Sequence, residues 1–327
     1  MIGITLGDPN GVGPEILLRT FLEKGLPCDC LAIGDYGIIR FCNDHLDLRV
    51  PLNRMKTPGD HRKGHLNIMD PGIIQEKDLT IGEISEKGGF AGLRYVEIAT
   101  EMALTGTIEA IVTLPIHKEA VRMVKPDFRG HTDLIAELCQ VKNFTMMLVA
   151  DMLIVTHISM HVSMREALDR IRTGHILEVI RLTHQAVGQL RSQARLAVAG
   201  LNPHAGEHGA FGDEEILEIG PAVVQARAEG MDVHGPLPPD TLFYQAVQGK
   251  YDAVVCMYHD QGHIPLKLLA FDDAVNVTLG LPVVRTSVDH GTAFDIAYQG
   301  KASLQSFYNA MVLAGKLSQA KEQSGVN

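Results

Sequence analysis

Short apolar segments of strand length alternate with longer segments of helical periodicity along almost the whole chain. The strand-like segments include residues 2–6, 109–113 and 253–257, and residues 91–104 carry apolar side chains at helical spacing. This alternation is typical of strand–helix–strand units, whose strands pair in parallel. The sequence therefore predicts an α/β fold with a doubly wound, mostly parallel sheet.

The chain has 327 residues, which is enough for two lobes. No linker or internal repeat separates them, so we expect the lobes to be intertwined. Residues 53–65 are mostly polar and are expected to form a loop. Residues 235–243, GPLPPDTLF, are expected to form a loop that enters a helix at Asp240 or Thr241.

The charge balance limits the class of partner. Net charge is −10 and 21% of the residues are charged, which argues against nucleic acid or an acidic membrane surface as a partner. The N-terminus has no basic stretch ahead of an apolar run, and no apolar run reaches the roughly 20 residues that span a bilayer. The five cysteines form no paired C-x-x-C motifs, so we expect reduced thiols and a cytoplasmic location.

Three predicted strands end on a histidine, at His157, His204 and His259. The last follows the strand at 253–257 and opens a polar stretch, residues 258–263, before a short apolar helix. One such histidine alone is better explained as a hydrogen-bonded side chain at a strand end. Three strand ends along one sheet edge could bring three imidazoles together with an open fourth position, which describes a catalytic divalent-metal site.

Cationic and polar side chains supply the local positive charge that an anionic substrate would need. Lys267 and Arg285 follow apolar runs, with Asn276 between them, and both are suited to phosphate or carboxylate. His131 and Thr132 stand at a predicted helix start, which is either a site for an anion or a helix cap. The pattern leaves these two explanations equal.

The motifs ITLGDPNGVGPEI, GHTDL, LNPHAGE, YHDQG, VNVTLGLP and RTSVDHGTA occur in this order along nearly the whole chain. In these motifs the chain resembles the 4-hydroxythreonine-4-phosphate dehydrogenase family. The resemblance implies a homodimer of two-lobed subunits, related in fold to isocitrate and isopropylmalate dehydrogenases. One lobe would contain residues 1–130 and 290–327, and residues 131–289 would form the metal- and dimer-forming lobe, with the active site in the cleft.

The resemblance also implies roles for individual residues. His157, His204 and His259 would bind one divalent metal, Zn²⁺ being favoured over Co²⁺, Mn²⁺ or Mg²⁺, and His259 would reach the site from the partner subunit. The implied substrate contacts are His131, Thr132, Lys267, Asn276 and Arg285. Asp289, His290, Gly291 and Thr292 would bind NAD, with NADP as the alternative. Phe294 and Tyr298 replace a proline and a glycine of the isocitrate dehydrogenase relatives.

The implied reaction is NAD-linked oxidation of a secondary alcohol, followed by loss of CO2 from the β-keto acid. Asp240 and Lys118 are the candidates for the group that takes the hydroxyl proton. The sequence GHIPLKLLAF resembles the branch of the family that acts on 4-phospho-D-threonate or 4-phospho-D-erythronate, and this branch is favoured. The alternatives are 4-phosphooxy-L-threonine, the substrate in vitamin B6 synthesis, and, from other classes, a zinc hydrolase or a non-catalytic metabolite-binding protein.

Overall fold

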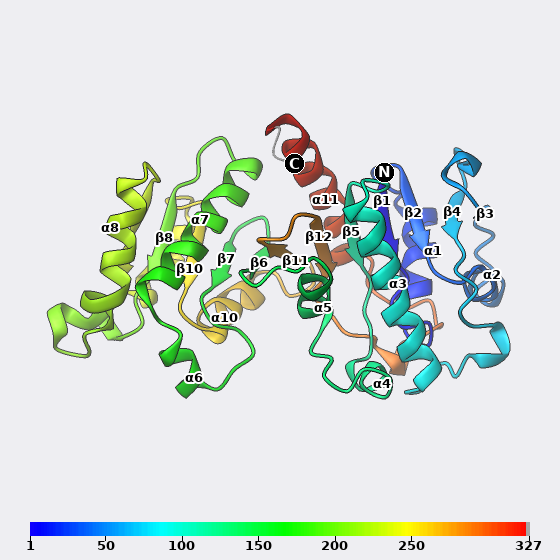
Figure 1. Ribbon diagram of the computed structural model, residues 1–327, viewed down its shortest axis with the longest axis horizontal. Helices are drawn as coiled ribbons and strands as arrows, with labels where there is room; N and C mark the ends of the chain where they lie inside the picture. Colours follow the sequence, from blue (N-terminus) through cyan, green and yellow to red (C-terminus); the bar gives the residue numbers. More distant parts are fainter. Residues whose placement is uncertain (325–327) are drawn as a thin grey trace. The chain divides into compact units, whose positions relative to one another are not determined.

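The computed structural model describes residues 1–324. They form two compact units, and the first unit contains both the N-terminal and the C-terminal segments of the chain. The first unit combines Met1–Lys142 with the described part of Leu281–Asn327, and the second is Asn143–Gly280. In Figure 1 the first unit therefore carries both the blue start and the red end of the chain.

In the first unit the strands lie in the order β3-β4-β2-β1-β5-β12, and every pair is parallel. They are β1 (Ile2–Thr5), β2 (Cys30–Ile33), β3 (Leu52–Met55), β4 (Leu66–Met69), β5 (Ala110–Thr113) and β12 (Val284–Val288). The central strands β1, β2 and β5 are buried at every position. Strands covered on both faces read as continuous apolar runs, which explains why they were predictable.

Helices connect these strands and cover the sheet (Figure 1). They are α1 (Gly13–Glu23), α2 (Tyr36–His45), α3 (Glu86–Leu104), α4 (Lys118–Arg122), α5 (His131–Leu138) and α11 (Gln305–Ser324), with short 3-10 turns at Pro58–Asp60, Glu76–Asp78 and Phe294–Ile296. α3 packs on β1 and β5, whereas α11 packs on β12 and β5. The helix that the sequence places at residues 91–104 begins earlier, because Ser85 caps it by accepting the Gly88 N–H.

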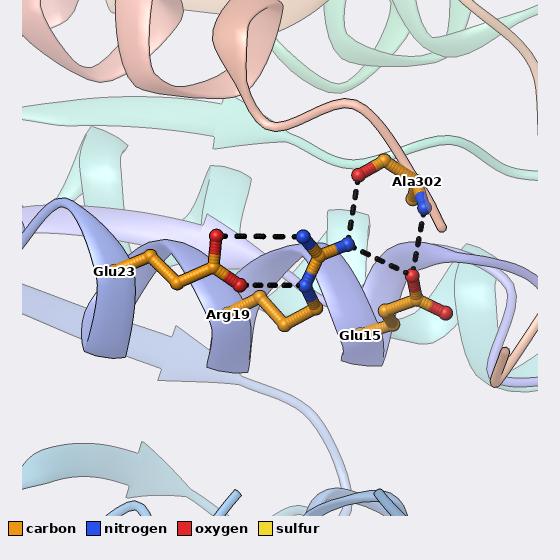
Figure 2. Close-up of polar contacts among 4 residues, drawn as sticks. All are labelled: Glu15, Arg19, Glu23 and Ala302. Atoms are coloured by element: carbon orange, nitrogen blue, oxygen red, sulfur yellow. Dashed lines mark hydrogen bonds and ion pairs between the residues drawn. The ribbon is translucent and has the colours of Figure 1, made fainter. Parts of the chain in front are cut away.

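A polar network joins α1 to the C-terminal segment (Figure 2). Glu15 is fully buried, and its Oε1 accepts the Ala302 N–H at 2.8 Å and an Arg19 N–H at 3.3 Å. Arg19 also donates to the Ala302 carbonyl at 2.9 Å and to the Glu23 carboxylate at 2.7 Å. The buried carboxylate is therefore paired with a cation, as a buried charge must be.

In the second unit the strand order is β11-β6-β7-β10-β8-β9. They are β6 (Thr145–Val149), β7 (Ile154–His157), β8 (Leu196–Ala199), β9 (Val233–Leu237), β10 (Ala253–Cys256) and β11 (Val275–Leu279). The pairs β11–β6 and β6–β7 are antiparallel, and β7, β10, β8 and β9 run parallel. The prediction of a mostly parallel α/β sheet is thus confirmed for both units.

The second unit contains five α-helices, of which α7, α9 and α10 contact β10. The five are α6 (Met164–Asp169), α7 (Thr173–Leu190), α8 (Gly220–Ala228), α9 (Pro239–Val247) and α10 (His259–Leu269), with a π-helical turn at Glu215–Ile219, here called η4. α7 lies on β10, β6 and β7, and α10 lies on β7 and β10. Val254 and Cys256 of β10 are fully buried among Leu148, Val155 and Ala197.

Three local expectations were wrong. Part of the segment 53–65 belongs to strand β3, and part of 235–243 belongs to strand β9. The helix expected after the polar stretch 258–263 starts within it, because α10 already begins at His259. Its charged and amide groups are therefore held on a rigid helix.

The boundaries between the units also differ from the predicted ones. Residues 131–142 and 281–289 belong to the first unit, not the second. The reason lies in the packing: α5 contacts α3, and β12 pairs with β5. The five cysteines are free. Across residues 1–324, no helix has the length and apolar character needed to cross a membrane.

Candidate functional site

Arg285 is a buried cation and the second residue of strand β12. Its side chain donates to the Thr113 hydroxyl at 2.7 Å and to the Thr132 hydroxyl at 3.3 Å. These two threonines stand at the end of β5 and in the first turn of α5. Burial lowers the pKa of Arg285 to about 9, so the guanidinium remains charged at neutral pH. The fold thus fixes a positive charge beside a helix N-terminus.

His131 is the first residue of α5 and lies in the field of two cations. Its Nε2 is buried and has no hydrogen-bond partner. Burial, followed by the charges of Arg285 and Lys118, holds the pKa of His131 well below its usual range. A neutral imidazole with an unsatisfied nitrogen, next to a guanidinium, a hydroxyl and an ammonium, is a cradle for an anion. The structure therefore brings together four residues named from the sequence: Lys118, His131, Thr132 and Arg285.

Lys267 and Asn276, the other predicted substrate residues, belong to the second unit. Lys267 is on α10, with its ammonium 5.3 Å from the centre of the exposed Phe271 ring. Asn276 is on β11 and donates to the Met146 sulfur at 3.0 Å, while its Oδ1 is buried without a partner. An amide oxygen left in this state is available to a ligand donor.

The three predicted metal ligands follow neighbouring strands of the second unit. β10 pairs with β7 on one side and with β8 on the other, all in parallel. His157 ends β7, His259 follows β10, and His204 follows β8. Their backbone positions therefore share one edge of the sheet, as the sequence predicts.

His157 is buried in a group of histidines. Its ring centre lies 4.7 Å from that of His263 and 6.3 Å from that of His259, and its Nε2 is 3.2 Å from Nδ1 of His263. Burial, then the neighbouring His263 and His259, lowers the pKa of His157 to about 3. His157 is therefore neutral near pH 7, the state in which imidazole binds metals. The imidazole donor set thus fits a divalent metal of the zinc type.

Two further histidines of this group were missed by the sequence argument. His263 stacks on His259 with ring centres 3.7 Å apart, because both lie on α10 at i and i+4. His161 lies 5.6 Å from His259 by ring centres, beside a cavity of about 280 Å³. The spacing HDQGH on a helix is the signal that could have identified His263.

His204 lies in a turn of unusual backbone geometry. Residues 204–208 all have positive φ, between 42° and 79°, and only one of them is glycine. A left-handed turn of this kind costs about 1–2 kcal/mol for each non-glycine residue. Nothing in the motif LNPHAGE predicts it, because glycine occurs there once. The His204 side chain is exposed, and its ring centre lies 6.2 Å from that of Phe211.

Within residues 1–324 of one chain, no group of three or more His, Cys, Asp or Glu side chains is placed to hold a metal. The expectation from sequence is that His259 completes the site of the partner subunit. A single chain does not test that arrangement. The three-histidine site remains a prediction.

The predicted cofactor residues lie in the loop after β12. His290 and Gly291 are exposed, whereas Thr292 is buried and its carbonyl accepts the Val12 N–H at 3.0 Å. The Asp289 N–H donates to the Ser306 hydroxyl at 3.2 Å. Phe294, which replaces a proline of the relatives, stacks on His117 with ring centres 4.9 Å apart. The loop is therefore anchored at Thr292 and accessible at His290 and Gly291.

Tyr298 has φ 60°, in the left-handed region that favours glycine, the residue that the resemblance implies at this position. Its hydroxyl donates to the Pro9 carbonyl at 2.8 Å.

The two candidates for the proton-accepting group are both exposed. Lys118 begins α4 in the first unit, and Asp240 lies in the first turn of α9 in the second.

A family profile described as "Pyridoxal phosphate biosynthetic protein PdxA" matches residues 27–314. The chain belongs to the PdxA family. It is 44% identical to a D-threonate 4-phosphate dehydrogenase of Salmonella typhimurium, with 97% of this chain and 98% of the relative covered. It also resembles the crystal structure of a 4-hydroxythreonine-4-phosphate dehydrogenase from Klebsiella pneumoniae, with 41% identity, a TM-score of 0.88, and 98% and 99% of the two chains covered.

The PdxA fold extends to more distant dehydrogenases. A β-decarboxylating dehydrogenase from Thermococcus kodakarensis aligns with a TM-score of 0.50 and 11% identity, over 100% of this chain and 84% of that one. At this identity the likeness concerns the fold alone. Together with the strand order, it confirms that the chain has an α/β fold like that of a β-decarboxylating dehydrogenase.

Proposed function

We propose that this PdxA-family chain is a metal-dependent, NAD-linked dehydrogenase. Its substrate is a 3-hydroxy-4-phosphooxy four-carbon acid, which it oxidises and decarboxylates, and 4-phospho-D-threonate or 4-phospho-D-erythronate is favoured. The observation that carries the proposal is the buried Arg285 beside Thr132 and the unsatisfied Nε2 of His131. A net charge of −10 repels an anion over the rest of the surface, so this local cluster supplies the attraction.

The residues of the first unit hold the phosphate and orient the substrate. Arg285 and Lys118 provide charge, Thr132 provides a hydroxyl, and His131 provides Nε2 and a helix N-terminus. Binding at a group remote from the reacting carbon supplies orientation without taking part in bond breaking. Burial is the main cause of the low pKa of His131, and a phosphate dianion would oppose the smaller contribution of Arg285 and Lys118.

In the second unit, His157, His204 and His259 would hold the divalent metal, whose chemistry is to polarise the substrate hydroxyl and stabilise negative charge on oxygen. His157 contributes because burial keeps it neutral. Asn276 contributes an amide oxygen that has no partner in the described chain. Lys118 and Asp240 remain the candidates for the group that accepts the hydroxyl proton.

The loop 289–292 would hold NAD, the hydride acceptor, and this assignment is supported by the exposure of His290 and Gly291. NADP is the alternative. The homodimer with shared active sites belongs to this proposal, and so does a cytoplasmic location.

The substrate name is not decided by similarity. The relatives at 44% and 41% identity are named for D-threonate 4-phosphate and for 4-hydroxythreonine-4-phosphate, and these values are too close to choose between them. 4-Phosphooxy-L-threonine, the vitamin B6 precursor, is therefore the second candidate. The two candidates differ at C2, where one has a hydroxyl and the other an amino group.

A substrate panel tests the proposal. Amino and hydroxy acids of both C2 and C3 configurations, each with and without the 4-phosphate, are incubated with NAD or NADP and Zn²⁺, Co²⁺, Mn²⁺ or Mg²⁺. We expect reduced-nicotinamide absorbance only with phosphorylated hydroxy acids, and the highest kcat/KM with the D-threonate or D-erythronate compound. If no phosphorylated acid gives reduced-nicotinamide absorbance, the proposed dehydrogenase activity is refuted. A zinc hydrolase or a metabolite-binding protein would then be the remaining candidates.

The variant Arg285→Gln extends the panel to the phosphate site. Loss of a charge-assisted hydrogen bond worth about 1.5–3 kcal/mol predicts a KM for the phosphorylated substrate that is higher by about 10- to 100-fold. Arg129→Gln removes an exposed cation next to the same helix start and should leave KM within about twofold. If both variants raised KM equally, substrate binding would depend on the general positive charge near this helix start and not on Arg285 itself.

A further inference from the structure

The left-handed turn, residues 204–208, presents His204 on a backbone that its own sequence disfavours. His204, Ala205, Glu207 and His208 all have φ between 42° and 57°. Side chains with a Cβ visit this region as single residues, not in succession. A strained segment of this kind persists only where its surroundings fix it, so the contacts around the turn decide its conformation.

Two neighbouring carboxylates surround the turn: Glu214 accepts from the Asn202 side chain at 2.6 Å, and Glu215 accepts from the backbone as well. Glu215, the first residue of η4, is only 4% exposed. Its Oε1 accepts both the Leu201 N–H and the Asn202 N–H, each at 2.7 Å. These are two of the three backbone donors between the end of β8 and the turn, and the third, the Gly200 N–H, donates to the Leu237 carbonyl. A carboxylate that accepts two backbone N–H groups makes short, strong hydrogen bonds.

The same carboxylate contacts the turn from its other oxygen. Glu215 Oε2 accepts a hydrogen bond from the Asn202 side chain at 2.9 Å. A Cβ on Gly206, in the centre of the turn, would lie 2.7 Å from this oxygen, and a Cβ on Gly200 would lie 3.1 Å from Oε1. The carboxylate is therefore packed directly against the turn, and glycines occur where it comes closest.

We propose that Glu215 is a positioning residue that holds the left-handed turn in the geometry needed for His204 to bind a divalent metal. Glu215 acts through the backbone of Leu201 and Asn202 and through Gly206, and it does not touch the metal or the substrate. The proposal rests on the proposed function, in which His204 is a metal ligand. A π-helical turn at Glu215–Ile219 is consistent with it, because such turns concentrate at functional sites.

The test compares Glu215→Ala and Glu215→Gln with Glu218→Ala in the metal-free full-length protein. Glu218 lies in the same η4 and accepts the Thr173 N–H at 2.6 Å and its hydroxyl at 2.8 Å, away from the turn. Removing the Glu218 side chain therefore weakens η4 and leaves the contacts of the left-handed turn unchanged. Zn²⁺ affinity is measured by competition with a chromophoric chelator, and amide hydrogen exchange is followed over residues 201–210.

We expect Glu215→Ala to weaken Zn²⁺ binding by about 10- to 100-fold, the range typical of residues that orient metal ligands. Exchange over residues 201–210 should accelerate even without metal. Glu215→Gln keeps one acceptor oxygen for the two backbone donors and should lie between Glu215→Ala and the wild type. Glu218→Ala should leave both readouts unchanged. If Glu215→Ala does not fold, Glu215→Gln against Glu218→Ala remains the deciding comparison.

Wild-type Zn²⁺ affinity and wild-type exchange in the Glu215 variants would overturn the proposal. His204→Ala separates this result from failure of the proposed function. If His204→Ala binds Zn²⁺ as tightly as the wild type, His204 is not a ligand and the metal site itself is wrong. Faster exchange with unchanged Zn²⁺ affinity would reduce Glu215 to a purely structural role and would also overturn the proposal.

Discussion

At the scale of single residues, Asp8 is a buried carboxylate in the turn between β1 and α1. It accepts the Asn10 N–H at 3.0 Å, and its second oxygen has no partner. Burial, only partly offset by the backbone donors of Asn10 and His117, raises the pKa of Asp8 from 3.8 to about 6. Folded Asp8 therefore holds its proton at pH values where the unfolded chain has already lost it.

The predicted consequence is a loss of stability as pH rises from about 4 to about 6. In this window the folded state binds more protons than the unfolded state, so the free energy of unfolding falls with pH. The shift corresponds to roughly 3 kcal/mol at 1.36 kcal/mol per pKa unit. Urea unfolding of the wild type and of Asp8→Asn at pH 4.5 and pH 7.5 should show this fall in the wild type relative to the variant. Parallel pH profiles would contradict it.

Residue identity alone did not reveal the turn around His204. Glu215 and Leu201 are 14 positions apart, and no local pattern predicts that one carboxylate accepts hydrogen bonds from two neighbouring amides. Arg285 was easier to recognise, because a cation in an apolar strand requires a reason. Its partner Thr132 is 153 positions away, so only the family resemblance placed the two together.

At the scale of elements, the strands that the sequence missed are β3 and β9. Each is the outermost strand of its unit and pairs with a single neighbour. Edge strands are partly exposed and tolerate polar residues and proline, as at Pro236 in β9. The apolar strands β1, β5, β8 and β10 were predictable because both of their faces are buried. The apolar sequence pattern thus identified the central strands of each unit and missed the outermost strands β3 and β9.

The network on α1 leads to a prediction about how that helix is fixed to the C-terminal segment (Figure 2). Arg19→Ala removes the cation beside the fully buried Glu15 and the hydrogen bond to the Ala302 carbonyl. We expect the free energy of unfolding to fall by about 2–4 kcal/mol, because a buried carboxylate loses its partner. Glu23→Ala breaks the ion pair on the other side of Arg19. The Glu23 side chain is 46% exposed, so this change should lower the free energy of unfolding by less than about 1 kcal/mol. Chemical denaturation of both variants decides whether the buried side of the network dominates.

At the scale of the whole molecule, the chain forms two compact units whose boundaries differ from those expected from the sequence. Helical and strand patterns locate elements, whereas the boundary depends on which sheet β12 joins and on which helix α5 packs against. These are long-range contacts without a local signature. The described residues place His157, His204 and His259 along one sheet edge without joining them into a metal site.

Mixing two inactive variants tests whether the site is shared between subunits. If His157 and His204 of one subunit act with His259 of the other, His204→Ala and His259→Ala are each inactive as homodimers. A mixed dimer has one site in which all three histidines are intact, since the lesions fall together in the other site. Half of a random mixture is mixed dimer, so dehydrogenase activity should return to about a quarter of the wild-type value after subunits are exchanged.

The matched control is a mixture of His157→Ala and His204→Ala. Those two residues belong to the same half of the site, so each site of the mixed dimer lacks one ligand and activity should stay absent. If all three ligands came from one chain, neither mixture would recover. Recovery in the first mixture alone therefore assigns His259 to the partner's site. Equal recovery in both would instead place His204 on one subunit and His157 with His259 on the other.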